Sequence, residues 1–271
     1  MVLGHKKAQK AHKMFLMRVV QLFGDGLLAV AYPQRCEICD ASVERGKFGV
    51  VCEECWRKTR VFDGTETLCW KCGLLHDAEE LTVSIAAEDV RCRRCEMHDF
   101  TVARAVGPYK GALRESVLQL KRQPHLAPQL EELLIAAAQR EPLNQSTRII
   151  PVPLHSRRLR SRGFNQATIM AQVLSRALRL PLDEVSLARV SLSEKYRAGL
   201  DAKGRRNTVA GAFEVRHPRL VANENILLVD DVFTTGATVS ACAAALVAAG
   251  ARNVFVLTIS RAVNTPGATY F

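Results

Sequence analysis

Eight of the nine cysteines in this 271-residue chain lie between residues 36 and 95, always as Cys-x-x-Cys pairs. The pairs are Cys36/Cys39, Cys52/Cys55, Cys69/Cys72 and Cys92/Cys95. The two-residue spacer lets both thiolates of a pair face one tetrahedral metal ion, and two pairs complete a four-cysteine site. The gap between the first two pairs is the size of a hairpin, as in a zinc ribbon. Because so short a segment buries little core of its own, bound metal is expected to hold it together.

The cysteine pattern predicts two structural Zn²⁺ ions, with the first pair joined to the second and the third to the fourth. An interleaved cross-brace is the alternative pairing. A disulfide framework is the weaker reading because nothing indicates an oxidising compartment, and a thioredoxin-like redox site would need one reactive pair rather than four. An iron–sulfur cluster uses the same ligands and stays open. The ninth cysteine, Cys242, is expected to be a buried small hydrophobe on an alanine-rich helix.

The chain is basic: 38 Lys and Arg against 27 Asp and Glu give a formal net charge of +11. This excess predicts a polyanionic partner, either nucleic acid or a small molecule with phosphate groups. Residues 1–33 combine a basic tail with apolar residues on one helical face, interrupted by polar ones, so neither a secretory signal nor a transmembrane segment is predicted. A helix packed on the protein body is expected there, with a membrane-surface helix as the alternative. The expected location is the cytoplasm.

From Phe100 onward, short apolar runs alternate with segments of helical spacing. The predicted strands cover residues 100–109, 148–154, 186–190, 211–215, 225–231 and 254–259. One predicted helix begins at a cap, Asn165, and buries a stripe of apolar residues. The stripe consists of Met170, Val173, Leu174, Ala177 and Leu178. Another helix is predicted over residues 130–138. Alternating strands and helices predict a parallel sheet covered by helices on both faces.

Asp230 and Asp231 follow the apolar run ILLV, so they are expected at the carboxyl end of a strand, where parallel α/β sheets bind ligands. A buried pair of like charges is costly unless sugar hydroxyls or Mg²⁺ compensate it. The turn that follows consists of Thr234, Thr235, Gly236, Ala237 and Thr238. Its backbone N–H groups and the helix N-terminus behind it suit a phosphate group. These features predict a ribose 5-phosphate site; a solvated acidic turn without a ligand is the alternative.

The run ILLVDDVFTTGAT resembles the diphosphoribose-binding signature of type I phosphoribosyltransferases. PVPLHSRRLRSRGFNQA (151–167) is similar to the matching segment of the ComF family of competence-associated proteins, and the cysteine pairs match that family's double zinc ribbon. The resemblance implies an α/β, type I phosphoribosyltransferase-like parallel sheet with helices on both faces, preceded by a small Cys-rich double zinc ribbon. The expected divisions are a basic tail and helix (1–33), the ribbon (34–98), the phosphoribosyltransferase-like domain (99–262) and a tail (263–271).

The resemblance also implies roles for single residues. Asp230 and Asp231 would contact the ribose hydroxyls of phosphoribosyl pyrophosphate (PRPP), bound with Mg²⁺, and residues 234–238 would hold its 5-phosphate. The loop that takes the pyrophosphate would contain His155, Ser156, Arg157 and Arg158. The segment 193–207 corresponds to the mobile loop of transferases, where Lys195, Arg197, Arg205 and Arg206 would neutralise the leaving group. Asp230, Asp231, Arg205 and Arg206 are therefore the expected catalytic residues. Ser156, Arg197 and Asn207 depart from the residues that family sequences often carry.

Two classes of function are compatible with these features. The first is a phosphoribosyltransferase with an acceptor that the sequence does not identify, acting in DNA uptake or DNA utilisation. The second is a non-catalytic accessory protein that binds single-stranded DNA and other DNA-uptake proteins, with the phosphoribosyl pocket as a ligand or regulatory site. Its expected nucleic-acid surface consists of Arg158, Arg160, Arg162, Arg197 and Lys203. The alternative for these side chains is that they serve only the phosphates of PRPP.

Overall fold

The computed structural model describes residues 34–43, 46–66, 69–74, 92, 97–190 and 211–262. The predictions for the amphipathic helix before residue 34, for Cys95, for the 193–207 segment and for the C-terminal tail lie outside these residues. Within the described ranges, no helix is both long and apolar enough to cross a membrane.

Four parallel strands form the central sheet, in the order β1-β6-β5-β2. Their bounds are β1 (Val102–Pro108), β2 (Arg148–Pro151), β5 (Asn225–Phe233) and β6 (Asn253–Arg261). β5 lies in the interior of the sheet, and the side chains of residues 226–229 are 0% exposed. A strand that is apolar on both sides requires cover on both faces of the sheet.

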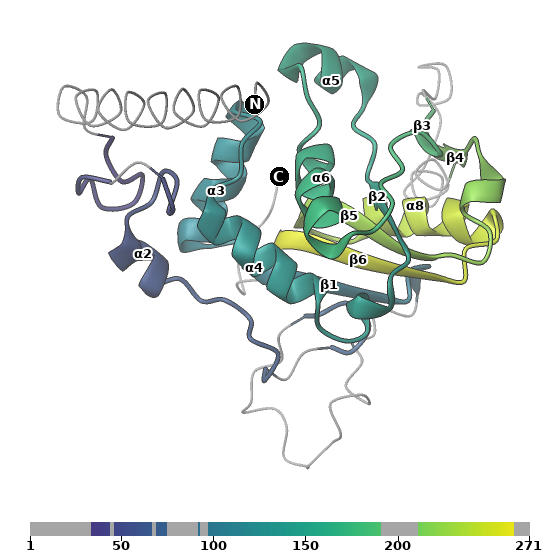
Figure 1. Ribbon diagram of the computed structural model, residues 1–271, viewed down its shortest axis with the longest axis horizontal. Coiled ribbons are helices and arrows are strands. Elements are labelled where there is room, and N and C mark those ends of the chain that lie inside the picture. Colours follow the sequence, from purple (N-terminus) through teal and green to yellow (C-terminus); the bar gives the residue numbers. More distant parts are fainter. Residues whose placement is uncertain are drawn as a thin grey trace, which may run out of the picture.

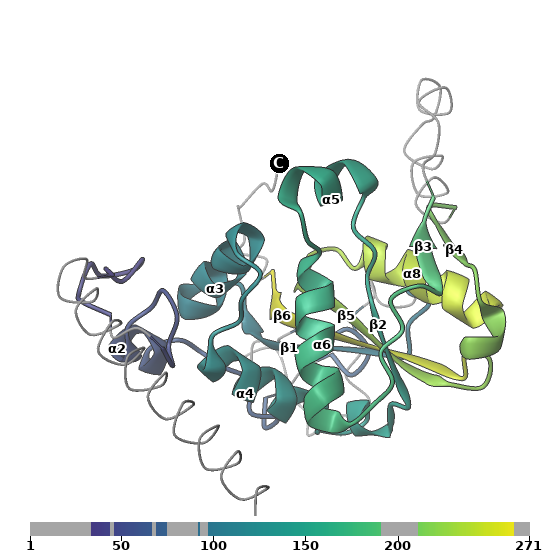
Figure 2. The same cartoon turned by 45° about the horizontal axis from the view of Figure 1, so that its top comes forward.

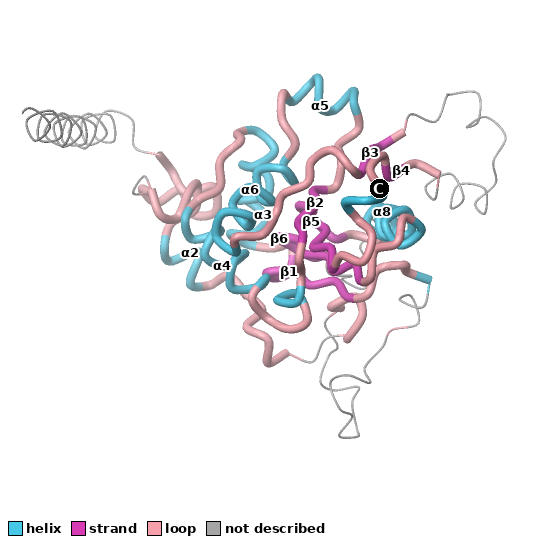
Figure 3. Tube along the Cα trace, turned by 45° about the vertical axis from the view of Figure 1, so that its right-hand side comes forward, coloured by secondary structure: helices cyan, strands magenta, loops and turns pink. Residues whose placement is uncertain are grey.

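Helices supply this cover on both faces (Figure 3). On one face lie α3 (Gly111–Arg122), α4 (Pro128–Ala138) and α6 (Gln166–Leu178), and α8 (Ala237–Ala248) lies on the other. The predicted parallel sheet with helices on both faces is confirmed. The shorter helices are α2 (Glu53–Arg57), η4 (Leu143–Gln145), α5 (Ser156–Arg162) and η6 (Pro218–Leu220).

Successive residues of β5 point into two separate apolar cores, as the period of two in a strand requires. Leu227 and Val229 pack with α3, α4 and α6, whereas Ile226 and Leu228 pack with α8. The helix α6 begins at the predicted cap: the Asn165 side chain accepts a hydrogen bond from the Ala167 N–H at 3.2 Å.

The apolar stripe predicted for α6 is correct in its first part and wrong at its end. Met170, Val173 and Leu174 are buried, but Ala177 is exposed and Leu178 is only partly buried.

Two of the predicted strands do not join the central sheet. β3 (Leu187–Arg189) and β4 (Phe213–Val215) form an antiparallel pair of their own. The sequence-based prediction assigned each short apolar run to one more parallel strand. Two runs without a helical crossover between them can instead pair as an antiparallel ribbon.

The cysteine-rich segment lies along the outer edge of β1 (Figures 1 and 2). The Phe62 N–H donates to the carbonyl of Val106 at 2.8 Å, and the Ala103 N–H donates to the carbonyl of Lys71 at 2.7 Å. The approach is close: a Cβ on Gly107 would lie 2.7 Å from the carbonyl oxygen of Arg60. The ribbon therefore protects an edge that would otherwise be free to pair with another chain.

The two parts of the cysteine-rich segment pack on opposite faces of the sheet. Cys36, Cys55 and Trp56 belong to the core shared with α3, α4 and α6, whereas Cys69 and Cys72 belong to the core shared with α8. Each cysteine cluster is thereby tied to a different part of the α/β fold.

Candidate functional site

The first two cysteine pairs converge in space. The ligand atoms of Cys36, Cys39, Cys52 and Cys55 all lie within 4.8 Å of one another, and the Sγ atoms of Cys39 and Cys52 are 3.7 Å apart. Zn–S bonds of about 2.3 Å in a tetrahedron place two sulfurs about 3.8 Å apart, whereas a disulfide needs about 2.05 Å. The cluster therefore fits one four-coordinate metal ion.

The pKa values of these thiols also indicate that the fully deprotonated cluster needs a cation. Burial acts to raise the pKa of the Cys36 thiol, but N–H groups of the backbone, that of Cys52 foremost, lower this pKa to about 6. Burial, followed by the neighbouring thiols, raises the pKa of Cys55 to about 12. Four thiolates cannot be charged together at neutral pH unless a metal ion compensates their repulsion.

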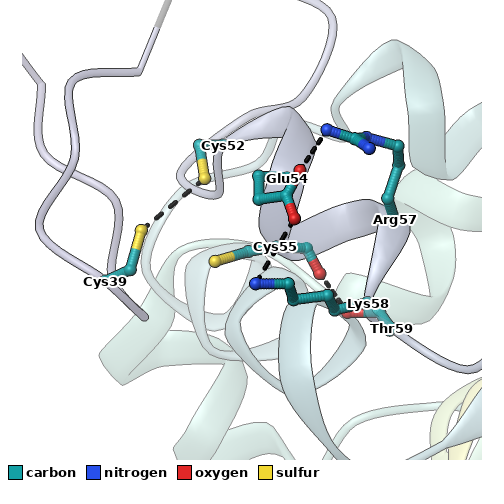
Figure 4. A network of polar contacts seen from close by, with 7 residues as sticks. All are labelled: Cys39, Cys52, Glu54, Cys55, Arg57, Lys58 and Thr59. Atoms are coloured by element: carbon teal, nitrogen blue, oxygen red, sulfur yellow. Dashed lines mark hydrogen bonds and ion pairs between the residues drawn. The ribbon is translucent and has the colours of Figure 1, made fainter.

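The helix α2 holds half of the first cluster in place (Figure 4). Cys52 is its N-cap residue, and the carbonyl of Cys55 accepts a hydrogen bond from the Thr59 hydroxyl at 2.8 Å. On the exposed side of α2, Glu54 forms ion pairs with Arg57 and Lys58 (Figure 4). These exposed pairs contribute little to stability, so α2 depends on the metal site and on its packing against α3.

The third cysteine pair meets Cys92 in a second cluster with the same local geometry. The Sγ atoms of Cys72 and Cys92 are 3.6 Å apart, and the Cys92 N–H donates to the Sγ of Cys69 at 3.3 Å. In the first cluster, the Cys52 N–H donates to Cys36 at the same distance, 3.3 Å. The predicted sequential pairing is confirmed for the described cysteines, and neither the cross-brace nor the disulfide framework is found among them. Cys242 is buried in the apolar core, as predicted.

A cavity of about 480 Å³ lies where β2 and β5 end. Its walls come from α3, the segment after β2, α5, α6, β3, β5 and the first turn of α8. The lining residues with charged or polar side chains are Lys121, Arg158, Arg162, Asn165, Gln166, Arg189, Asp230, Asp231 and Thr238. The position matches the expectation that ligands bind beyond the carboxyl ends of parallel strands.

The cavity gathers some of the predicted site residues and not others. Asp230, Asp231, Thr238, Arg158 and Arg162 line it. The predicted residues that do not line it are His155, Ser156, Arg157, Arg160, Thr234, Thr235, Gly236 and Ala237. Arg197, Lys203, Arg205 and Arg206 lie outside the described residues.

Four of the polar lining residues were not predicted as site residues: Lys121, Asn165, Gln166 and Arg189. Lys121 and Arg189 are separated from the carboxylates by long stretches of sequence, and no local pattern marks them. Gln166 had a weak signal, since it follows the helix cap Asn165. Its Nε2 is buried and has no hydrogen-bond partner among the described residues.

The predicted pyrophosphate loop is wrong in its conformation: the residues after β2 form the helix α5, which stands away from the sheet (Figures 1 and 2). Its N-cap is His155, whose Nδ1 accepts from the Arg157 N–H at 3.2 Å. The helix divides the arginines between two sides. Arg158 and Arg162, four residues apart, share the side that faces the cavity. Arg157 and Arg160 do not reach the cavity and are exposed.

The two carboxylates of β5 are in different electrostatic environments. Asp231 forms an ion pair with Lys121, with Oδ2 and Nζ 3.3 Å apart, and its N–H donates to Oδ1 of Asp230 at 2.9 Å. Burial, and secondly the charge of Asp231, raises the pKa of Asp230 to about 7, against the opposing effects of the Asp231 N–H, Lys121 and Arg189. At neutral pH the site therefore holds a carboxyl group that a cation or hydrogen-bond donors would convert to its charged form.

The turn after β5 has the backbone that was predicted. Gly236 has φ of +80° and is the N-cap of α8. A Cβ at this position would lie 2.6 Å from the ring of Phe233, so the turn requires glycine for space as well as for conformation. The first N–H groups of α8 have no partner within the helix, and Thr238 brings this helix end to the cavity.

A second cavity, of about 500 Å³, lies between the ribbon, β1 and the end of α4, and none of the predicted PRPP residues lines it. Its two arginines have structural contacts: Arg104 donates to the carbonyl of Trp70 and Arg140 to that of Phe62.

Comparison with known proteins identifies relatives along most of the chain. Residues 27–96 match the double zinc ribbon domain. The DNA utilization protein YhgH of Shigella flexneri is 32% identical over 237 residues, which cover 84% of this chain and 97% of that protein. Competence protein F of Haemophilus influenzae is 38% identical over 118 residues, which cover 42% of this chain and 50% of that protein. The zinc assignment of the cysteine clusters thus has support from both geometry and sequence.

Solved structures with a similar fold include two enzymes named for phosphoribosyl compounds. The glutamine PRPP amidotransferase from B. subtilis has a TM-score of 0.35 and 16% identity, covering 55% of this chain and 27% of that one. The purine phosphoribosyltransferase from Pyrococcus horikoshii has a TM-score of 0.29 and 14% identity, covering 59% of this chain and 91% of that one. The present chain spans about a quarter of the amidotransferase.

We expect the purified protein to contain two zinc ions per chain, because eight paired cysteines supply four ligands for each ion. Replacing Cys39 with serine should reduce the content to one, since the two clusters are separate. Elemental analysis after removal of loosely bound metal measures both values. A content of one ion in the unmodified chain, or iron in place of zinc, would contradict the assignment.

Asp230→Asn should change how stability depends on pH. With a pKa of about 7 in the fold against 3.8 in the unfolded chain, the native state binds the extra proton, so the free energy of unfolding falls as pH rises between these values. Asparagine does not titrate, so the variant does not lose this part of the free energy of unfolding as pH rises. We expect the variant to be more stable at about pH 8 by about 1–2 kcal/mol, less than the full shift implies because solvent screens a partly exposed group.

Urea denaturation at several pH values measures the effect. Glu214→Gln, at an exposed carboxylate of β4, is the control and should not alter the pH profile. If Asp230→Asn and the unmodified protein lose stability in parallel between pH 4 and pH 7, the carboxyl group does not have the raised pKa.

Proposed function

Because the chain belongs to the ComF family, we propose that it binds PRPP or a related ribose 5-phosphate together with Mg²⁺, and that it acts in DNA uptake or DNA utilisation in the cytoplasm. The observation that carries the proposal is the cavity of about 480 Å³, in which an acidic pair, a helix N-terminus and basic side chains from separate elements face one space. The names of the relatives, DNA utilization protein and competence protein, support the biological part.

The charges of the cavity favour a polyanion that arrives with a divalent cation. Four basic side chains line it, and two carboxylates oppose them, which leaves a formal excess of two positive charges (4 − 2 = +2). The basic residues are Lys121, Arg158, Arg162 and Arg189. The phosphate groups at the two ends of such a ligand would bind the basic side chains, and its ribose hydroxyls or Mg²⁺ would bind the carboxylates.

The fold suggests which residue would bind which part of PRPP. Thr238 and the N-terminus of α8 are suited to the 5-phosphate, since free N–H groups and the helix dipole favour an anion there. Asp230 and Asp231 are suited to the ribose hydroxyls and Mg²⁺. Arg158 and Arg162 are suited to the pyrophosphate, whose oxygens a planar guanidinium binds in pairs.

Lys121 would have to give up its contact with Asp231 when a cation enters. In the free protein its ammonium group lies 3.3 Å from that carboxylate and supplies the compensating charge. Once Mg²⁺ takes this place, Lys121 is available to a phosphate oxygen of the ligand. Lys121 therefore has a suitable partner in both states: Asp231 when the site is empty, and a phosphate oxygen when Mg²⁺ and the ligand are bound.

If the protein is a phosphoribosyltransferase, the bond between the anomeric carbon and pyrophosphate breaks while a bond to an acceptor, such as a base nitrogen, forms. The chain's own part would be to orient PRPP and to stabilise the departing pyrophosphate through arginines. Mg²⁺ would supply further charge stabilisation when bound. Arg205 and Arg206 remain predicted members of this machinery.

A calorimetric titration with PRPP, with and without Mg²⁺, tests the proposal. We expect binding that depends on Mg²⁺ and is stronger at about pH 8 than at about pH 6, because Asp230 must be deprotonated to act as a ligand. Asp230→Asn combined with Asp231→Asn should abolish binding while zinc content is retained, and Glu214→Gln is the matched control. A protein that binds neither PRPP nor ribose 5-phosphate at millimolar concentration would contradict the proposal.

Binding of single-stranded DNA is a second candidate, favoured by the exposed arginines of α5. Arg157 and Arg160 lie on a helix with no buried residue and do not reach the cavity, so they are free to meet a separate phosphate backbone. The second function does not exclude the first, because the two sides of α5 present different arginines.

Two double variants on the same helix separate these candidates. Arg157→Ala with Arg160→Ala should weaken binding of single-stranded DNA and reduce the log–log salt slope by about 1.4, at about 0.7 for each phosphate contact. PRPP binding should be unchanged. Arg158→Ala with Arg162→Ala should weaken PRPP binding. Fluorescence anisotropy at several salt concentrations measures the slope, and DNA binding that is absent or independent of salt would remove this candidate.

A further inference from the structure

Two arginines approach the second cysteine cluster from neighbouring strands. Arg261, the last residue of β6, is only 7% exposed; its Nη1 donates to the carbonyl of Cys72 and its Nη2 to the Sγ of Cys72, at 3.4 Å. Arg104 of β1 donates to the carbonyls of Trp70 and Ala103, at 2.8 and 2.9 Å. Within the described ranges, neither arginine forms an ion pair with a carboxylate.

A buried guanidinium without a counter-charge is costly, so the negative charge must come from elsewhere. Zn²⁺ with four thiolates carries a net charge of −2, which two arginines would balance. The first cluster differs: in the described part of the chain, the Sγ of Cys36 accepts from a backbone N–H, and the Sγ of Cys39 lies against that of Cys52.

From the metal ligand Cys72, a continuous set of contacts leads to the turn after β5. The guanidinium carbon of Arg261 lies 4.4 Å from the centre of the Phe233 ring. Phe233 in turn meets the rings of His98 and Phe100 edge-on, at centroid distances of 6.3 and 5.8 Å. The same ring limits Gly236, where an added Cβ would lie 2.6 Å from it.

The cysteine-rich segment holds this aromatic group from a second side. Lys71, next to Cys72, donates from Nζ to the carbonyl of His98 at 2.6 Å. The following residue, Asp99, accepts at Oδ2 from the hydroxyl of Ser240, in the first turn of α8, at 2.8 Å. Both the ring that packs on the turn and the helix that follows it therefore contact residues fixed by the second cluster.

We propose that Arg261 is a positioning residue that makes the order of the turn Thr234–Thr238 depend on metal at the second cysteine cluster, and not on metal at the first. With metal bound, the Cys72 thiolate retains the guanidinium, which stays against Phe233. Without metal, Cys72 is no longer fixed by a ligand bond, so the two acceptors that hold the guanidinium are free to move and Phe233 loses this support. The inference rests on the proposed function only in treating the turn as the phosphate-binding element.

Hydrogen exchange of the intact chain tests the proposal without any ligand. The measured segment is 233–242, in the zinc-loaded protein and in four variants: Arg261→Met, Arg261→Lys, Cys72→Ser and, as matched control, Cys39→Ser. We expect Cys72→Ser and Arg261→Met to accelerate exchange in this segment, and Cys39→Ser to leave it unchanged although it also loses one metal ion. Arg261→Lys should be intermediate, since lysine keeps the charge but cannot reach both acceptors of Cys72.

Metal retention provides the second measurement. A lost second-sphere donor typically lowers metal affinity by about 10–100-fold, so Arg261→Met should release one of its two zinc ions to a chelator earlier than the unmodified protein. The exposed Arg216→Met is the matched control and should release both ions at the unmodified rate. Unchanged zinc release in Arg261→Met, or equal exchange of 233–242 in Cys72→Ser and Cys39→Ser, would overturn the proposal.

A titration of the unmodified protein with PRPP separates this proposal from the preceding one. If PRPP does not bind but exchange responds to the second metal site, the structural coupling stands and the ligand assignment fails. If PRPP binds and exchange does not respond, the coupling fails while the ligand assignment stands.

Discussion

The burial of β5 on both faces is the constraint on which the rest of the structure depends. Residues 226–229 have no exposure to solvent, so helices must lie on both sides of the sheet, and α8 has to return along one face directly after the strand. That return requires a tight turn, which Gly236 allows with φ of +80°. The same geometry leaves Asp230 and Asp231 where the apolar environment ends. The placement of the acidic pair beside a helix N-terminus thus follows from how a buried strand reaches its covering helix.

The cysteine-rich segment solves a different problem, that of the outer strand. A four-stranded sheet has two edges, and β1 forms one of them. Without cover, such an edge can pair with strands of other chains. Residues 62 and 71 hydrogen-bond to that edge, and the two cysteine clusters pack into cores on opposite faces. A metal-stabilised segment suits this task because it keeps a defined shape with little core of its own. The ribbon is therefore part of the α/β fold rather than an appendage to it.

Local chemistry made the strands, the α6 cap, the metal pairing and the acidic pair predictable from the sequence. Each rests on a short pattern: Cys-x-x-Cys, Asn165 before an apolar stripe, or two aspartates after four buried residues. The failures concern contacts between distant segments. Lys121 and Arg189 reach the cavity only because α3 and β3 end beside β5, and β3 pairs with β4 outside the main sheet. The sequence assigned Arg157 and Arg158 to pyrophosphate and Arg158, Arg160 and Arg162 to nucleic acid. Helical geometry instead turns Arg158 and Arg162 toward the cavity and leaves Arg157 and Arg160 outside it.

The acidic pair shows how a site can be prepared for a ligand at a cost to the fold. The pKa of Asp230 is about 7, so near neutral pH this residue exchanges between a neutral form, which the buried surroundings tolerate, and a charged form, which they disfavour. Any cation that binds the pair favours the charged form and releases a proton, so ligand binding and deprotonation are linked. Lys121 already provides part of this compensation at Asp231. The turn beside the pair must hold its shape while this charge changes. Packing of Gly236 against Phe233 and the hydrogen bond from Ser240 to Asp99 contribute to its order, so the residues behind that ring matter for the site.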